Sequence, residues 1–299
     1  MSEILITGGS GFIGDALMPV LVAKGYEPIV FTRDVKRSKK RHGQLSDHLR
    51  YIFDFDQLKS MPWAVINLAG AGIADRRWTD ARKRLLRDSR IGVTERLVQR
   101  LGSLNGAPEK IISGSAVGYY GPLVDAIATE KTGPGSDFSA LLCSDWEGAI
   151  APLGLGTTAL SILRIGVVLG RPGGFLGRLE PVFRLGAGGP LGDGQQMFSW
   201  IHRDDLVNLM VWCLEHSTGG IYNATSPGPV SNEGFTRALG RTLRRPTIFR
   251  IPEHPARWIL GDLASLLFEG QAVRPKAAID EGFIFNHPDL DEALADLFR

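Results

Sequence analysis

The chain has 299 residues, 43% of them hydrophobic and 22% charged, and its 34 Lys and Arg nearly balance its 32 Asp and Glu. This composition allows a large buried core, excludes a disordered or collagen-like chain, and gives no net charge that would favour nucleic acid. We expect a cytoplasmic protein with a small-molecule substrate and without nucleic-acid or membrane partners. The apolar runs are too short to span about 30 Å of hydrocarbon, and the N-terminus shows no basic leader.

Cysteine is sparse in this sequence. Cys143 and Cys213 can form at most one disulfide, and no group of cysteines has the spacing of a metal site. We expect both thiols to be reduced and buried like small hydrophobic residues, and we predict no bound metal.

Short β-branched or apolar runs alternate with helical periods in the first half of the chain. An apolar run at 4–7 precedes several glycines and a helical pattern over 12–23. Further strands are predicted at 28–32, 51–55, 64–68 and 110–113, and further helices begin at Thr79-Asp80 and cover 138–150. This alternation predicts a parallel, doubly wound sheet.

The second half of the chain changes in texture after a β-branched run over 159–169. Glycine and proline dominate 170–194, which we interpret as either a linker or a mobile segment folded over a site. Later strands are predicted at 197–201 and 221–224, and later helices at 204–214 and 232–243. We expect Asp204 or Asp205 to cap the first of these helices.

These elements predict an α/β protein with a Rossmann-like, doubly wound parallel sheet and a smaller C-terminal α+β region on the substrate side. Residues 1–165 would form the dinucleotide-binding domain. Residues 166–299 would mostly cover the substrate, with 197–225 returning to the first domain.

A glycine loop, Thr7-Gly8-Gly9-Ser10-Gly11-Phe12-Ile13-Gly14, lies between the first predicted strand and the first predicted helix. The glycine at 8 permits a tight turn, the one at 11 lets the backbone approach a diphosphate, and the one at 14 lets the helix pack on the strand. The N-terminus of the helix offers unpaired N–H groups to phosphates. This context predicts a dinucleotide site.

The end of the second strand distinguishes NADP from NAD. Chains that bind NAD often carry an acidic residue there, whereas Arg is typical of NADP because guanidinium donors match the 2′-phosphate. The sequence reads Thr32-Arg33-Asp34 and continues with basic residues to Arg41. Arg33 favours NADP (NADPH), while Asp34 leaves NAD open, and we expect 39–41 to lie in a solvated basic loop.

Motifs along almost the whole chain resemble those of the extended short-chain dehydrogenases/reductases. They are the glycine loop, Asn67-Leu68-Ala69-Gly70, Ser113-Gly114-Ser115-Ala116 with Tyr119-Tyr120-Gly121, the run from Leu163 to Gly170, the run from Trp200 to Asp205, and Glu269-Gly270-Gln271. More narrowly, the chain is similar to the atypical YfcH-type, or SulA-type, nucleoside-diphosphate-sugar epimerases. The resemblance implies NADP as cofactor and a small polar substrate such as a nucleotide sugar, and it is compatible with a homodimer.

The resemblance also implies which residues contact the cofactor. They lie in the glycine loop, at the ends of several strands and on the helix that follows Thr79. They are Gly8, Ser10, Gly11, Phe12, Ile13, Gly14, Thr32, Arg33, Leu68, Ala69, Gly70, Arg90, Arg164 and Val168. Arg90 is expected to neutralise a phosphate from a helix that runs beside the cofactor.

The catalytic pattern of the superfamily is incomplete in this chain. Ordinary members combine a Ser or Thr with a Tyr and a Lys spaced YxxxK, where the lysine lowers the tyrosine pKa. Ser115 matches the serine and ends a strand, at the sheet edge where such folds bind ligands. Counted from Trp146-Glu147, the YxxxK window falls on 139–143, so Ser139 replaces the tyrosine and Cys143 replaces the lysine.

Proton transfer therefore has several open routes. Tyr119 or Tyr120 acts as the acid, Cys143 acts as a thiol acid or nucleophile, another donor such as His202 or water takes part, or catalysis is lost. We predict Ser115, Tyr119 and Cys143 as the catalytic residues.

Two kinds of function fit these features. The first is an NADP(H)-dependent oxidoreductase or epimerase, in which Ser115 binds the reacting hydroxyl or carbonyl and 170–194 closes over the substrate. The second is a non-catalytic protein that binds NADP(H) as a structural or sensory ligand. The missing Tyr-Lys pair favours the second function, whereas the preserved Ser115 favours the first.

Overall fold

The main sheet of the computed structural model, which describes residues 2–123, 126–154, 156–254, 258 and 261–299, has seven strands. Their order is β11-β7-β5-β4-β1-β2-β3, and every neighbouring pair is parallel. The strands are β1 Glu3–Thr7, β2 Glu27–Phe31, β3 Arg50–Ile52, β4 Ala64–Asn67, β5 Lys110–Ala116, β7 Ala159–Ile165 and β11 Gly220–Ala224. The predicted doubly wound parallel sheet is confirmed.

The strand order reverses between β1 and β4. The chain first builds outward from β1 through β2 to β3, then returns to the other side of β1 with β4, β5 and β7. Loops that leave β1 and β4 therefore diverge, and open α/β sheets bind ligands in the crevice at such a point, outside the carboxyl ends of the strands.

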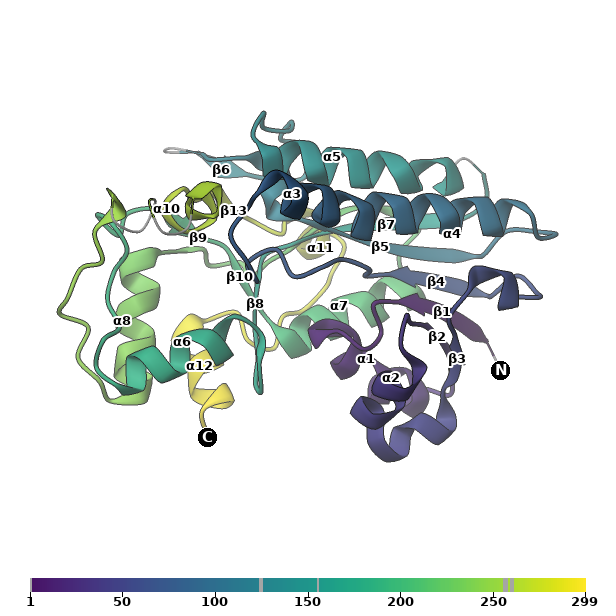
Figure 1. The fold of residues 1–299 in the computed structure, drawn as a ribbon, viewed down its shortest axis with the longest axis horizontal. Coiled ribbons are helices and arrows are strands. Elements are labelled where there is room, and N and C mark those ends of the chain that lie inside the picture. Colours follow the sequence, from purple (N-terminus) through teal and green to yellow (C-terminus); the bar gives the residue numbers. More distant parts are fainter. Residues whose placement is uncertain (1, 124–125, 155, 255–257, 259–260) are drawn as a thin grey trace.

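Helices cover both faces of this sheet (Figure 1). One face carries α4 (Val93–Gly102) and α5 (Phe138–Ile150), with α3 (Asp80–Arg87) beside them, and the other carries α1 (Phe12–Ala23) and α7 (Arg203–Glu215). Successive side chains of β1 point to opposite faces of the sheet, which explains the two helical layers. Ile4 packs in one core with Leu17 of α1, whereas Leu5 packs in the other core with Leu97 of α4.

A smaller unit with its own apolar core lies beside the carboxyl ends of the strands. It contains three two-stranded sheets, β8 with β10, β9 with β12 and β6 with β13. Its elements are β6 Ile127–Ala128, β8 Val167–Leu169, α6 Gly174–Arg184, β9 Met197–Phe198, β10 Trp200–His202, β12 Val230–Ser231, α8 Asn232–Leu243, α10 Ser265–Phe268, β13 Ala272–Val273 and α12 Leu290–Leu297. Trp200, Phe235 and Leu294 are among its buried residues. The helix α11 (Lys276–Asp280) packs instead against β11 of the main sheet.

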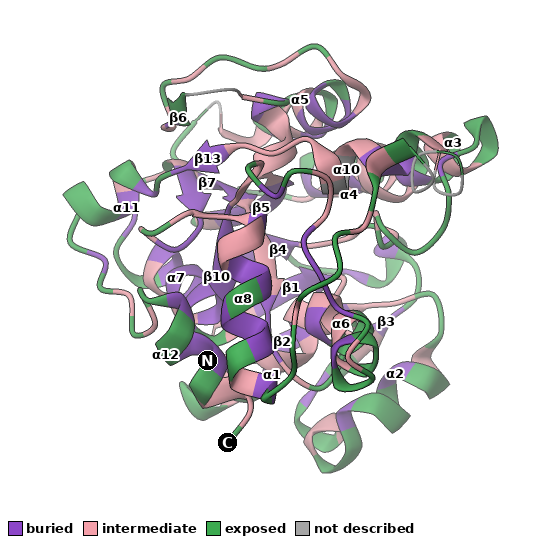
Figure 2. Ribbon diagram, turned by 90° about the vertical axis from the view of Figure 1, so that its left-hand side faces the viewer, coloured by how far each residue is buried: buried purple, intermediate pink, exposed green. Residues whose placement is uncertain are grey.

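Several predicted elements differ from the structure. The strand predicted at 197–201 is broken at Ser199, because β9 pairs with β12 and β10 pairs with β8 in a different sheet. The basic stretch expected as a loop is a helix, α2 (Val35–His42), whose N-terminus is capped by Asp34 and which is largely exposed (Figure 2). The strand predicted at 51–55 ends at Ile52, and a 3-10 turn follows at Phe55–Gln57. The run 159–169 is broken at Gly166 because β7 and β8 belong to different sheets.

The glycine-rich stretch 170–194 is more ordered than a linker. It contains α6, whose Leu176 and Phe183 are buried in the core of the smaller unit. The linker interpretation is therefore wrong, and closure over a site stays a prediction. In the described ranges, no helix is long and apolar enough to cross a membrane.

The N-terminus of α7 anchors the C-terminal segment to the main sheet. His202, and not Asp204 or Asp205 as predicted, caps this helix, because its Nδ1 accepts from the Asp204 N–H at 3.2 Å. Asp205 is fully buried and its carboxylate accepts from the N–H groups of Asn286 and His287, at 2.8 and 2.9 Å. The predicted cap is wrong because the Asp205 carboxylate is hydrogen-bonded to the distant loop that contains Asn286 and His287.

Replacing Asp205 by Asn tests this anchor. The amide group offers one acceptor and one donor to two N–H groups, so we expect Asp205→Asn to lower the free energy of unfolding by about 2 kcal/mol in urea titrations. Asp204→Asn is the matched control, since Asp204 is exposed and should change the stability by less than about 1 kcal/mol. Equal effects of the two variants would contradict the anchoring role of Asp205.

Candidate functional site

The glycine loop lies at the reversal point and approaches β4 closely. Gly8 has φ of +72°, and a Cβ there would lie 2.5 Å from the Leu68 carbonyl oxygen. A Cβ on Gly14 would lie 2.5 Å from the Gly8 carbonyl oxygen, so neither position accepts a larger residue. No side chain caps α1, which begins at Phe12, and its first N–H groups can therefore bind phosphate.

A hydrogen-bonded network of buried polar groups supports the floor of the crevice. Thr7 donates to Asn67 Oδ1 at 2.7 Å, and Asn67 Nδ2 donates to Thr94 Oγ1 at 2.9 Å. Trp146 Nε1 donates to the same Thr94 oxygen at 3.1 Å, and the Ala69 N–H donates to Thr7 Oγ1 at 3.1 Å. These bonds fix the ends of β1 and β4 relative to α4 and α5.

Arg33 lies just beyond the carboxyl end of β2. Thr32 and Arg33 follow the strand directly, and Arg33 is exposed. The carboxylate of Asp34, which left NAD open in the sequence, accepts from the Arg37 N–H at 2.9 Å and caps α2. This engagement of Asp34 strengthens the case for a phosphate at Arg33.

Arg90 lies on a π-helical turn, Asp88–Gly92, between α3 and α4. Its guanidinium donates to the carbonyls of Leu86 and Ala71, at 3.2 and 3.0 Å, and stacks over Trp146. Burial lowers its pKa. A Cβ on Gly70 would lie 3.0 Å from the Arg90 guanidinium carbon, so Leu68, Ala69 and Gly70 lead from β4 straight to this cation.

Ser115 belongs to a buried ion-pair network on the neighbouring strands. Its Oγ donates to Glu147 Oε1 at 2.6 Å. Arg164, which pairs with Ser115 in the β5–β7 register, binds both Glu147 oxygens, at 2.9 and 2.8 Å. The side chains of Arg164 and Glu147 are 2% and 11% exposed, so the pair is shielded from solvent.

Arg164 keeps its positive charge at neutral pH. Burial opposes the positive charge of Arg164, but the hydrogen bonds and negative charge of Glu147 outweigh burial and raise the Arg164 pKa. Arg164 is thus engaged by Glu147, and its predicted contact with the cofactor stays a prediction. Sequence reasoning did not select Glu147, although its position four residues after Cys143 places both on one face of α5.

The two tyrosines of the turn Val117–Tyr120 have different surroundings. Tyr120 is buried, accepts from Arg164 Nη1 at 3.0 Å and donates to Asn223 Oδ1 at 2.6 Å, and burial raises its pKa. Tyr119 is half-buried, with the Arg164 guanidinium 3.3 Å above its ring. Among the described residues no hydrogen bond is made by the Tyr119 hydroxyl, which can therefore bind a ligand.

Cys143 lies next to the same network. Burial raises the pKa of its thiol to about 11, and that of the Cys213 thiol to about 12. Both cysteines are free and buried, as the sequence predicted. A thiol with such a pKa is protonated at pH 7, which disfavours Cys143 as a nucleophile. Its predicted catalytic role stays untested.

His202 and Val168 lie on the paired strands β10 and β8, in the smaller unit. His202 is 1% exposed, with Nε2 3.6 Å from Asp296 Oδ2 and its ring against His287. Burial, followed by the charge of His287, lowers its pKa. Because Nδ1 accepts the capping N–H, the neutral ring carries its proton on Nε2 and offers no lone pair to a metal there. His202 thus caps α7, and its alternative role as a proton donor and the predicted cofactor contact of Val168 stay predictions.

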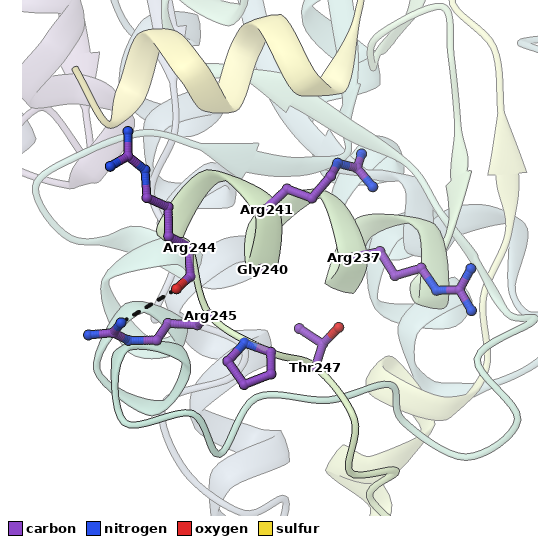
Figure 3. Close-up of a pocket in the computed structure, with 7 residues that line it drawn as sticks. Arg237, Gly240, Arg241, Arg244, Arg245 and Thr247 are labelled. Atoms are coloured by element: carbon purple, nitrogen blue, oxygen red, sulfur yellow. Dashed lines mark hydrogen bonds between the residues drawn. The ribbon is translucent and has the colours of Figure 1, made fainter.

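A hollow of about 480 Å³ at the C-terminal end of α8 is separate from this site. Figure 3 shows that the arginines around it point in different directions. Arg237 and Arg241 bind Glu233 and Asp291, and Arg245 donates to the carbonyls of Arg184 and Arg244. The guanidinium groups therefore do not converge on one anion.

The buried ion pair gives a prediction about stability. Glu147→Gln leaves the Arg164 guanidinium without its counter-ion, so we expect the free energy of unfolding to fall by about 3 kcal/mol in urea titrations. The control is Glu215→Gln, which breaks the half-exposed pair with Lys24 and should cost less than about 1 kcal/mol. A loss no larger than in the control would show that the buried pair does not stabilise the fold.

Two family models match the chain. The model described as the NAD dependent epimerase/dehydratase family matches residues 4–225, and a domain of unknown function, DUF1731, matches residues 251–297. The epimerase family protein ML0860 of Mycobacterium leprae is 37% identical over 295 residues, which cover 98% of this chain and 94% of that protein.

Solved structures agree with these matches. The human epimerase family protein SDR39U1 (isoform2), crystallised with NADPH, has a TM-score of 0.89 and 32% identity, and the match covers 99% of both chains. The nucleoside-diphosphate sugar epimerase from Corynebacterium glutamicum has a TM-score of 0.77 and 28% identity. That match covers 99% of this chain and 58% of the other.

Proposed function

Since the chain belongs to the NAD-dependent epimerase/dehydratase family of extended short-chain dehydrogenases/reductases, we propose that it is an NADP(H)-dependent oxidoreductase or epimerase with a nucleotide sugar as substrate. One observation carries the proposal: Ser115, hydrogen-bonded to Glu147, lies at the carboxyl end of β5 in a sheet whose reversal point holds an intact glycine loop. The 28%-identical Corynebacterium protein is named a nucleoside-diphosphate sugar epimerase, which supports a nucleotide sugar as the substrate.

Residues 1–165 would hold the cofactor, and most of 166–299 would lie on the substrate side. We assign the diphosphate to the N–H groups of the glycine loop and the 2′-phosphate to Thr32 and Arg33, because Asp34 is engaged by α2. Leu68, Ala69 and Gly70 would line the crevice with Arg90. The 32%-identical human protein crystallised with NADPH supports this assignment.

Bound NADP(H) supplies a hydride donor or acceptor, and the chain itself must handle the proton. The Ser115 hydroxyl donates its one proton to Glu147. Towards a ligand Ser115 can therefore act only as a hydrogen-bond acceptor. A substrate hydroxyl can be the donor of that hydrogen bond. During oxidation Ser115 Oγ would take the hydroxyl proton and pass its own to Glu147, and the reverse transfer would accompany reduction.

Tyr119 is the second group that we assign to the reacting oxygen. Its hydroxyl has no partner among the described residues, and its ring is held by the Arg164 guanidinium. Cys143 would act by packing beside Ser115. A non-catalytic NADP(H)-binding sensor is the second candidate function, which the protonated, buried Cys143 at the expected lysine position favours.

The cofactor assignment predicts a change in selectivity. In Arg33→Ala we expect NADPH to bind about tenfold more weakly because a charge-assisted contact with the 2′-phosphate is lost, while NADH, which lacks that phosphate, binds as before. Nicotinamide fluorescence titrations measure both dissociation constants. The control is Arg50→Ala, because Arg50 lies at the amino end of the neighbouring strand β3, whereas Arg33 follows the carboxyl end of β2. An unchanged NADPH preference in Arg33→Ala would overturn the assignment.

The catalytic assignment is tested with UDP-glucose, UDP-glucuronic acid and UDP-N-acetylglucosamine in the presence of NADP(H). Absorbance follows the nicotinamide and NMR detects epimers. We expect Ser115→Ala to lower turnover at least about 100-fold, whereas Ser161→Ala, at a buried serine that pairs with Ser217, keeps it. Tight NADPH binding with no turnover of any hydroxyl or carbonyl compound tested would favour the sensor instead.

A further inference from the structure

Arg203 is a cation without an anion. It is the first residue of α7, and its guanidinium lies over the ring of Phe12, 5.2 Å from the centroid. Its Nε is buried and has no hydrogen-bond partner. Within the described residues, no carboxylate forms an ion pair with Arg203.

This arrangement is unfavourable without a ligand. A positive charge at the first residue of a helix meets the positive end of the helix dipole, and a buried N–H without an acceptor loses its hydration without compensation. Asp204, the next residue, is exposed and forms no ion pair with Arg203. Two further acidic groups, on α7 and α1, are engaged elsewhere. Asp205 binds the N–H groups of Asn286 and His287, and Asp15 on α1 lies 3.3 Å from Arg41. The contact with the Phe12 ring offsets only part of the cost.

Three elements meet at Phe12. It begins α1, where the uncapped N–H groups of the glycine loop lie. A Cβ on Gly170, just after β8, would lie 2.9 Å from Arg203 Cβ and 3.0 Å from Phe12 Cζ. A Cβ on Gly174, at the start of α6, would lie 2.7 Å from the Phe12 ring. Small residues thus keep Arg203 close to the N-terminus of α1, the place that the glycine loop prepares for phosphate.

We propose that Arg203 binds a diphosphate at the N-terminus of α1 and thereby connects the glycine loop to the substrate-side unit. The inference rests on the proposed function, which supplies two ligands with this chemistry. One is the diphosphate of NADP(H), and the other is the diphosphate of a nucleotide sugar. Either would give the Nε–H an acceptor and give the guanidinium the counter-ion that this part of the chain does not supply.

The test compares Arg203→Met with Arg203→Lys in the full-length protein. Methionine keeps an apolar side chain over Phe12 and removes the charge, whereas lysine keeps the charge. The matched control is Arg171→Met, because Arg171 also stacks on an aromatic ring, that of Phe298, but is paired with Glu180. Each protein is titrated with NADPH, then with UDP while NADPH is saturating, and separately with adenosine 2′-monophosphate, which has no diphosphate.

We expect Arg203→Met to weaken NADPH or UDP about tenfold or more, Arg203→Lys to weaken it less, and Arg171→Met to leave both unchanged. Adenosine 2′-monophosphate should bind all four proteins equally, which excludes a general folding defect. A loss for NADPH identifies the cofactor as the ligand, and a loss for UDP alone identifies the nucleotide sugar.

Thermal unfolding separates a binding role from a structural one. Without ligand, Arg203→Met should melt at the wild-type temperature or above it, because the mutation removes an uncompensated cation. Wild-type affinity for both NADPH and UDP in Arg203→Met, or a lowered melting temperature of the ligand-free variant, would overturn the inference. Failure of the wild-type protein to bind NADPH would overturn the proposed function with it, whereas binding without turnover would leave the Arg203 assignment intact.

Discussion

The buried pair of Glu147 and Arg164 determines the geometry of the carboxyl edge of the sheet. Removing these two charges from water costs on the order of several kcal/mol per ion. Only a bidentate contact with further hydrogen bonds can offset that cost. The structure supplies both, because Arg164 binds two oxygens of Glu147 and one hydroxyl of Tyr120. Through Ser115 and Asn223 the same network reaches β5 and β11. One ion pair therefore positions three strands, a helix and a turn around the candidate site.

The parts of the fold that sequence predicts well are those that local chemistry determines. The helix 12–23 agrees with its prediction because a glycine loop precedes it and Lys24-Gly25 ends it, and the helix 138–150 begins after a capping Asp137. The helix α2 was missed because only Ser38 and His42 are buried in it, so no apolar period marks it. The break at Gly166 cannot be predicted from the sequence, because the local pattern there favours one continuous strand. β-branched residues continue on both sides, and only contacts with distant backbone end the strand.

The same distinction applies to the site. The glycine loop, Arg33 and Ser115 are recognisable because each lies in a short motif whose context is a strand end. Glu147 was not selected because its partner, Arg164, is 17 residues away, and the two meet only when α5 packs on the sheet. Arg203 gives no sequence signal either. Its lack of a counter-ion is a property of the folded chain, which brings the start of α7 to the start of α1.

Gly166 makes the two units inseparable. β7 pairs with β11 in the main sheet, β8 pairs with β10 in a small one, and the two meet at Gly166, where a Cβ would lie 2.7 Å from the Ser199 carbonyl oxygen. A fragment ending before Gly166 would lack β11 and α7, leaving β7 as an unpaired edge and the apolar face under α7 open to water. Such a fragment would aggregate. Insertions, deletions and fusions between the two units are therefore restricted. The substrate side can change its sequence mainly by substitutions within elements that remain connected to the main sheet.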